Sequence, residues 1–185
     1  MRIVLEVARL LKALGMRVLA CKRRPEMRLE NRFCKPGIGD PTGAIPEAWY
    51  GFKDFETMLS QCDVLIVTLP DTNATRALIT RHHLSALPPH ALLVSVGRGT
   101  VIDDLALADL LRDGRLAGAG LDVVAEEPLL PTSPLWSMPN VIIAPHIASY
   151  IVEQADLASE VLIENMRRDH TGEPLLNLID FVSGY

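Results

Sequence analysis

Unbroken apolar runs recur along this sequence, and segments with helical spacing separate most of them. The runs cover residues 17–21, 62–70, 91–97, 118–124 and 140–145. Strands that are buried on both faces read as continuous apolar runs, whereas half-exposed strands alternate apolar and polar residues. The pattern therefore predicts a parallel sheet with helices on both faces, which is a doubly wound α/β domain.

Helices are expected between and around these strands. Apolar spacing predicts a helix over 2–14, and polar capping residues predict three further helices, at about 54–59, from 73 or 75 to 79, and from 103 or 104 to 111. A long final helix is expected over 150–170, with an apolar face towards the core. Residues 22–50 are rich in proline and glycine, which predicts a long loop.

Composition excludes several classes of protein. The chain has 185 residues, of which 49% are hydrophobic, and 18 basic residues stand against 23 acidic ones. That profile fits a globular domain and argues against a nucleic-acid binder. No apolar run approaches the ~18 residues that span a bilayer, and the first helix does not read as a signal peptide. The three cysteines (Cys21, Cys34 and Cys62) lack metal-site spacing, so a cytoplasmic protein without a metal site or disulfide framework is expected.

Three polar residues follow three successive predicted strands: Arg98, Glu127 and His146. Ligands of doubly wound sheets bind beyond the carboxyl ends of the strands. A carboxylate beside an imidazole favours the protonated ring, and an arginine can hold an anionic substrate. The set suits proton transfer to a carbonyl while another group supplies hydride. Taken singly, each residue also has a structural explanation, as a helix cap, a surface charge or a structural histidine.

Three long motifs extend this pattern: CDVLIVTLPDTNATRALI, LLVSVGRGTVIDDLALADLLRDGRLAGAGLDVVAEEPL and SPLWSMPNVIIAPHIAS. Through them the chain resembles the nucleotide-binding domain of the D-isomer-specific 2-hydroxyacid dehydrogenases, from about residue 2 to residue 180. The resemblance implies a Rossmann-like fold and hydride transfer between NAD(P)H and a 2-keto acid or D-2-hydroxy acid. It implies that His146 is the general acid/base, that Glu127 pairs with it, and that Arg98 binds the substrate carboxylate and carbonyl.

The resemblance also implies a set of cofactor-binding residues. Asp122 matches the acid that bonds the nicotinamide carboxamide, and the other members of the set are Lys22, Arg23, Leu69, Pro70, Val96, Gly97, Arg98 and His146. NAD-preferring members usually carry Asp where this chain has Lys22. The basic run Lys22-Arg23-Arg24 suits the 2′-phosphate of NADP, so the cofactor is NAD or NADP with NADP favoured. A solvated basic turn is the alternative interpretation.

The sequence departs from the family pattern at its start. Met1 stands where the second glycine of G-x-G-x-x-G would be, and Val4 stands in place of the third. The first central strand, the Gly-rich loop and the substrate domain are therefore expected to be missing, so that 1–185 is one incomplete nucleotide-binding domain. In the usual strand order 3-2-1-4-5-6, that loss leaves the strand at 17–21 and its neighbour on one side and three strands on the other.

Two kinds of function follow. The first is an NAD(P)-dependent D-2-hydroxyacid dehydrogenase, or a fragment of one, with a small 2-keto or 2-hydroxy acid as its partner. The alternative is a catalytically inactive nucleotide-binding or subunit-pairing remnant of the same family. The family resemblance also allows a homodimer, whereas neither a nucleic acid nor a membrane is expected as a partner.

Overall fold

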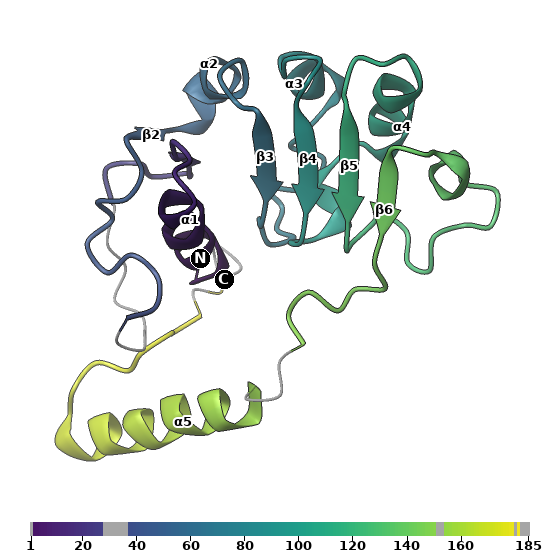
Figure 1. The fold of residues 1–185 in the computed structure, drawn as a ribbon. Coiled ribbons are helices and arrows are strands. Elements are labelled where there is room, and N and C mark those ends of the chain that lie inside the picture. The colour runs from purple at the N-terminus through teal and green to yellow at the C-terminus, as the bar shows by residue number, and fades with distance from the viewer. Residues whose placement is uncertain (1, 28–36, 151–153, 180, 182–185) are drawn as a thin grey trace.

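The larger of two parallel sheets contains four strands. The computed structural model describes the whole chain except residues 1, 28–36, 151–153, 180 and 182–185 (Figure 1). The four strands pair in chain order and are β3 (Val64–Val67), β4 (Leu92–Ser95), β5 (Gly118–Leu121) and β6 (Val141–Ile143). Leu65 and Leu93 lie opposite each other in the register and are both buried. The predicted doubly wound α/β class is confirmed.

The smaller sheet pairs β1 (Leu19–Cys21) in parallel with β2 (Ala48–Tyr50). Among the described residues, no strand pairing joins it to β3. The sheet is thus divided where the family order places its first strand. Two expectations were wrong in detail: β2 lies inside the expected loop at 22–50, and the other side holds four strands because β6 also pairs with β5.

Five α-helices connect or follow these strands in the described part of the chain. They are α1 (Arg2–Ala13), α2 (Phe55–Leu59), α3 (Arg81–Ser85), α4 (Asp104–Arg112) and α5 (Gln154–Thr171), together with the 3-10 turns η1 (Phe52–Asp54), η2 (Gly99–Val101) and η3 (Pro134–Ser137). Helix α4 begins as predicted, because the Asp103 side chain accepts a hydrogen bond from the Ala106 N–H at 3.0 Å.

The helix expected from residue 73 or 75 to 79 does not form. The buried Thr75 hydroxyl instead donates to the Pro70 carbonyl at 2.5 Å and contacts the Thr72 hydroxyl at 2.8 Å, which closes a tight turn. Ala77 has φ +52, and Ile79 forms a parallel bridge with Ile102. The helix comes later, as α3, where Thr80 and His83 form a capping box.

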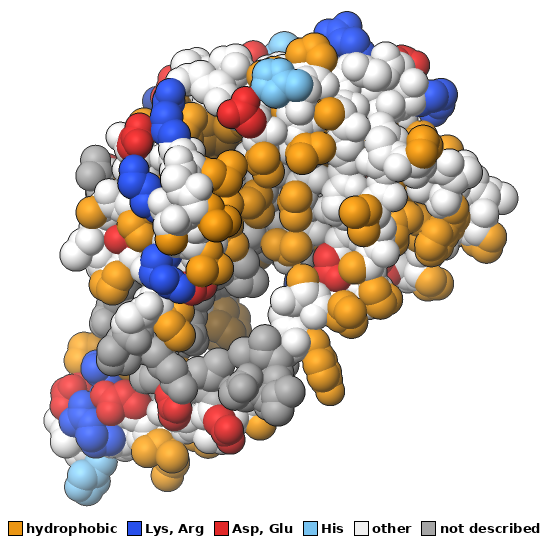
Figure 2. Space-filling view, in the orientation of Figure 1, with side chains coloured by type: hydrophobic (Ala, Val, Ile, Leu, Met, Phe, Trp, Pro, Cys, Tyr) orange, Lys and Arg blue, Asp and Glu red, His pale blue; other side chains and the backbone are white. Residues whose placement is uncertain are grey.

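The core lies between the four-stranded sheet and its helices. Its fully buried large side chains are Leu59, Ile79, Leu84, Leu93, Leu107, Leu116 and Val101. Figure 2 shows further apolar side chains gathered on the face between α1 and the four-stranded sheet, where the two sheets are not paired. None of the described helices is both long enough and apolar enough to cross a membrane.

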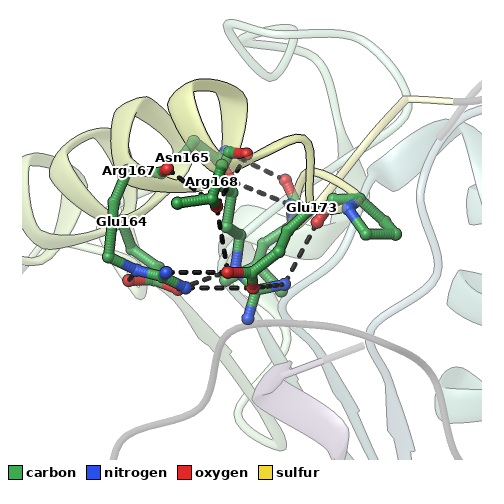
Figure 3. A network of polar contacts seen from close by, with 8 residues as sticks. Glu164, Asn165, Arg167, Arg168 and Glu173 are labelled. Carbon is green, nitrogen blue, oxygen red and sulfur yellow. Dashed lines mark hydrogen bonds and ion pairs between the residues drawn. The ribbon is translucent and has the colours of Figure 1, made fainter.

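Helix α5 lies apart from both sheets (Figure 1). The expectation that its apolar side faces the core was wrong, since Leu162 and Met166 are 61% and 65% exposed. The helix is instead tied to the segment that follows it, as Figure 3 shows. Arg167 bonds both Glu164 and Glu173, and the Asn165 amide bonds the backbone N–H and C=O of Leu176 at 2.8 and 3.1 Å. We call α5 with residues 172–176 the helical clasp.

The two described cysteines are both unpaired and partly buried. Burial, with a smaller effect of Asp54, raises the pKa of the Cys21 thiol to about 12. Burial also raises the pKa of the Cys62 thiol. Both thiols are therefore protonated at neutral pH and are weak nucleophiles. Cys34 lies outside the described residues.

Candidate active site

The carboxyl ends of β3 to β6 share one edge of the sheet, because all four strands are parallel. Arg98, Glu127 and His146 lie in the segments that follow β4, β5 and β6. The structure thus brings the three residues to neighbouring positions along one edge. In this fold that edge is where ligands bind.

Glu127 and His146 are in direct contact. Glu127 Oε2 and His146 Nδ1 are 2.8 Å apart, and Glu127 Oε1 also accepts a hydrogen bond from the Val124 N–H at 3.3 Å. The two side chains are 39% and 41% exposed, so the pair is open to solvent and to small molecules. Because Nδ1 is engaged by the carboxylate, Nε2 is the ring nitrogen that can exchange a proton with a bound molecule.

Arg98 follows β4, the strand next to the one that precedes Glu127, and no hydrogen bond or ion pair joins it to Glu127 or His146 in the described residues. Its side chain is exposed, and Nη1 donates to the carbonyl of Gly97 at 2.8 Å. In the part of the chain that the structure describes, the guanidinium forms no ion pair with a carboxylate, and it carries a fork that matches a planar anion.

The glycines that flank Arg98 have a structural role that the sequence did not reveal. A Cβ on Gly97 would lie 2.5 Å from the carbonyl oxygen of Leu69. A Cβ on Gly99 would lie 1.9 Å from the carbonyl carbon of Val124. The family resemblance implied that one of these two glycines, Gly97, lines the cofactor site. In the structure, the absence of a side chain at both glycines lets the backbone after β3 and after β5 contact the loop after β4 directly.

Asp122 lies directly after β5 and is only 7% exposed. Its Oδ1 accepts a hydrogen bond from the Ile147 N–H at 2.8 Å, and its Oδ2 accepts one from the Ala148 N–H at 2.9 Å. The carboxylate therefore lies beneath the segment that carries His146. A carboxylate offers about four acceptor positions, so these two bonds leave capacity for a further donor.

The remaining cofactor residues predicted on this edge are Leu69, Pro70 and Val96, which follow or end β3 and β4. Directly after Pro70 the structure shows an ion pair that sequence reasoning missed. Arg76 Nη2 and Nε donate to the Asp71 carboxylate at 2.9 and 3.2 Å. Arg76 lowers the pKa of this carboxyl, and the charge of Arg98 contributes. The search for polar residues just after a strand would have identified Asp71.

Lys22 and Arg23 follow β1, in the smaller sheet. The Lys22 ammonium donates to the Met27 carbonyl and lies 5.6 Å from the centre of the Trp49 ring, while Arg23 and Arg24 are exposed. The basic run therefore lies at a strand end, as predicted. The run follows a strand of the smaller sheet, whereas Arg98, Glu127 and His146 follow strands of the larger one.

The residues present fit part of a dinucleotide site. The basic run after β1 suits a phosphate, and the ends of β3 and β4 offer the apolar residues Leu69, Pro70 and Val96. The described first turn of α1 carries no glycine, and Val4 is half-buried there. No group of three His, Cys, Asp or Glu side chains in the described residues could hold a metal ion.

The fold and this edge define a nucleotide-binding α/β domain. Residues 2–148 match the family model described as D-isomer specific 2-hydroxyacid dehydrogenase, NAD binding domain. The chain belongs to that family, whose members are NAD(P)-dependent oxidoreductases.

Similar curated proteins carry reductase names. The chain is 39% identical over 127 residues to glyoxylate/hydroxypyruvate reductase B of Pectobacterium carotovorum, covering 69% of this chain and 40% of that protein. It is 34% identical over 179 residues to glyoxylate reductase of Aeropyrum pernix, covering 97% and 49%. The chain thus spans less than half the length of these relatives.

Similar solved structures contain the phosphorylated cofactor. An NADPH-dependent glyoxylate/hydroxypyruvate reductase from Sinorhizobium meliloti, in complex with NADP and sulfate, matches with a TM-score of 0.77 and 28% identity, over 98% of this chain and 53% of that one. A D-isomer specific 2-hydroxyacid dehydrogenase from Xanthobacter autotrophicus Py2, in complex with NADPH and MES, matches with a TM-score of 0.70 and 39% identity, over 77% and 46%.

Proposed function

We propose that this chain is the nucleotide-binding part of an NAD(P)-dependent oxidoreductase that interconverts a 2-keto acid and a D-2-hydroxy acid. The observation that carries the proposal is the 2.8 Å contact between Glu127 and His146 at the carboxyl edge of the sheet, with Arg98 at the neighbouring strand end. A nicotinamide cofactor supplies the hydride when bound.

His146 is the proton donor and acceptor in this proposal. A carbonyl that accepts hydride gains negative charge on its oxygen and requires a proton. Glu127 holds Nδ1, so Nε2 faces the reacting oxygen and delivers that proton in reduction or accepts it in oxidation. The carboxylate of Glu127 also stabilises the positively charged ring before the proton is transferred.

Arg98 is the substrate-binding residue in this proposal. Its guanidinium can form two parallel hydrogen bonds with a carboxylate, which fixes the orientation of a 2-keto acid as well as its position. The Asp71–Arg76 ion pair is consistent with this assignment, because Arg76 bonds both oxygens of Asp71, a carboxylate on which the charge of Arg98 also acts. Arg98 is therefore available to a bound anion.

NADP is the proposed preferred cofactor. Positive charge after β1 suits a 2′-phosphate, and Lys22 is oriented over Trp49. The NADP and NADPH complexes of similar structures agree with this choice. Titration of the chain with NADPH and with NADH tests it. We expect NADPH to bind more tightly, and a Lys22→Ala, Arg23→Ala double variant to lose that difference. Equal or tighter binding of NADH would contradict the preference.

The activity is tested by following NAD(P)H oxidation at 340 nm with glyoxylate or hydroxypyruvate, which are suggested by the names of the relatives. We expect His146→Ala to lower kcat by about 10²- to 10⁴-fold, which is the usual contribution of a general acid. His82→Ala is the matched control, because that histidine lies in α3 and contacts Glu56 of α2, and both helices lie at the amino-terminal end of the strands (Figure 1). Turnover that survives His146→Ala would contradict the proposed role.

A second candidate is an inactive nucleotide-binding or subunit-pairing remnant of the family. It is favoured by the divided sheet, in which no described strand pairing joins β1 to β3. NAD(P)H binding without turnover on any 2-keto acid would favour this candidate over the enzyme.

A further inference from the structure

The segment that carries His146 has an unusual backbone. His146 has φ +56, which is the left-handed region that residues with a side chain rarely adopt. Such a conformation persists where surrounding contacts hold it. The next two N–H groups along the chain, those of Ile147 and Ala148, supply such contacts, because both donate to Asp122.

Asp122 is well placed to hold that backbone. It is buried, and its own N–H donates to the Ser95 carbonyl at 2.9 Å, which continues the pairing of β4 with β5. Its position is therefore fixed by the sheet. Because this one rigid carboxylate accepts two hydrogen bonds, at 2.8 and 2.9 Å, it fixes both the position and the orientation of the turn that donates them.

A second aspartate holds the segment that carries Glu127. Asp104 lies in the first turn of α4, and its Oδ2 accepts a hydrogen bond from the Ala125 N–H at 2.7 Å. The preceding N–H, that of Val124, donates to Glu127 itself. Two successive backbone groups of this segment are thus bonded to carboxylates, one from the helix and one from the acid/base pair. Burial raises the pKa of the Asp104 carboxyl, which agrees with its enclosed position.

We propose that Asp122 and Asp104 are positioning residues for the acid/base pair. Asp122 holds the backbone of His146, Asp104 holds the backbone before Glu127, and together they bring Nδ1 and Oε2 to 2.8 Å. That this positioning serves catalysis rests on the proposed function. The positioning itself can be measured on the chain without turnover.

The two aspartates differ in how many acceptor oxygens they use. Asp122 uses both oxygens, whereas Asp104 uses one towards Ala125. Asparagine keeps one acceptor and replaces the other by a donor. Asp122→Asn must therefore place an N–H₂ group against a backbone N–H, while Asp104→Asn can keep its bond. Asp104→Ala removes that bond.

The experiment is ¹H–¹⁵N NMR of the histidine rings in the full chain, labelled at its five histidines. His146→Gln assigns the His146 signals, and Glu127→Gln defines the spectrum of a ring that has lost its carboxylate. We expect Asp122→Asn and Asp104→Ala to move His146 towards the Glu127→Gln spectrum, and Asp104→Asn to stay with the unmodified chain. Unchanged signals of the other histidines report an intact fold.

Amide hydrogen exchange in the unmodified chain gives a reading that needs no variant. Ile147 and Ala148 are exposed residues, so their N–H groups owe protection to Asp122. We expect both to exchange at least tenfold more slowly than an unstructured peptide. Exchange at the unstructured rate, or a His146 spectrum that Asp122→Asn and Asp104→Ala leave unchanged, would overturn the inference. The chain could show no turnover while its His146 spectrum still changes in Asp122→Asn and Asp104→Ala. That result would support the positioning inference and would contradict only the proposed enzymatic activity.

Discussion

Gly99 shows how closely the loops of the candidate active site pack. An added Cβ would lie 1.9 Å from the carbonyl carbon of Val124, and that backbone leads directly to Glu127. Gly99→Ala must therefore displace either the Arg98 loop or the Glu127 loop. We expect it to lower the free energy of unfolding by about 1–3 kcal/mol or more, as overpacking does, and urea denaturation would measure this.

Gly120 provides the matched control for that substitution. It lies in β5, and the nearest atom to an added Cβ is the Val94 Cγ2 at 3.9 Å, which is ordinary contact. Gly120→Ala should therefore change stability by less than about 0.5 kcal/mol. Equal effects of the two substitutions would show that the loops after β4 and β5 are not packed as described.

Some residues of the candidate site could be predicted from the sequence, whereas the contacts of others could not. Arg98, Glu127 and His146 could be located because each follows an apolar run, and a parallel sheet brings such positions together. The positioning contact of Asp104 could not, because its partner Ala125 becomes a neighbour only when α4 packs beside β5. Asp122 was predicted to bind the cofactor, and its bonds to the His146 segment emerged only from the fold.

Among the elements, the helical clasp is stabilised by side chains rather than by a core. Asn165 bonds both backbone groups of Leu176. Asn165→Ala should therefore accelerate amide exchange at Leu176, whereas Asn165→Asp, which keeps the acceptor at 2.8 Å, should accelerate it less. Exchange rates by NMR measure this, with the Leu93 amide of β4 as an internal control. Equal rates in both variants would contradict the pairing.

The clasp should also respond to acid. Hydrogen bonds from Arg167 and then Arg168 lower the pKa of Glu164 from 4.5 to about 2. A carboxyl whose pKa is lowered by folding adds stability above its unfolded pKa and loses it as the pH falls towards the folded value. The protection of the Leu176 amide, measured against an unstructured peptide at the same pH, should therefore fall as the pH drops from 4.5 towards 2, and 1 M salt at pH 7 should also lower it. Protection that is independent of both would contradict the role of Glu164.

Elements differ in how well the sequence predicted them. The strands at 62–70, 91–97, 118–124 and 140–145 were found because each is a continuous apolar run. The burial on both faces that such runs predict is incomplete, since Leu92 of β4 and Ile142 of β6 are 45% and 76% exposed. The helix expected from residue 73 or 75 to 79 was misplaced because Thr75 bonds back to Pro70, and a side chain that competes for backbone groups is not visible in apolar spacing. The short strand β2 was missed because it has only three residues within a loop-like composition.

Across the whole molecule, the two sheets should differ in local stability. The larger sheet contains fully buried side chains such as Leu93, whereas β2 is only half-buried throughout. Hydrogen exchange should therefore be at least tenfold faster at Lys22, whose N–H pairs with Tyr50, than in the centre of β4. Mass spectrometry of the exchanged chain measures this. Uniform protection across both sheets would show that they open as one unit.

The division of the sheet also separates, along the chain, the proposed acid/base residues from the basic run proposed to bind the nucleotide. The strand ends that carry Arg98, Glu127 and His146 all come from one continuous stretch between Val64 and Ala148, while the basic run after β1 lies before it. One recombination crossover near α2 would transfer the strand ends with the proposed acid/base residues intact and exchange the basic run that we propose selects the nucleotide. If the proposed roles hold, the choice of cofactor and the acid/base chemistry can be inherited independently in this architecture.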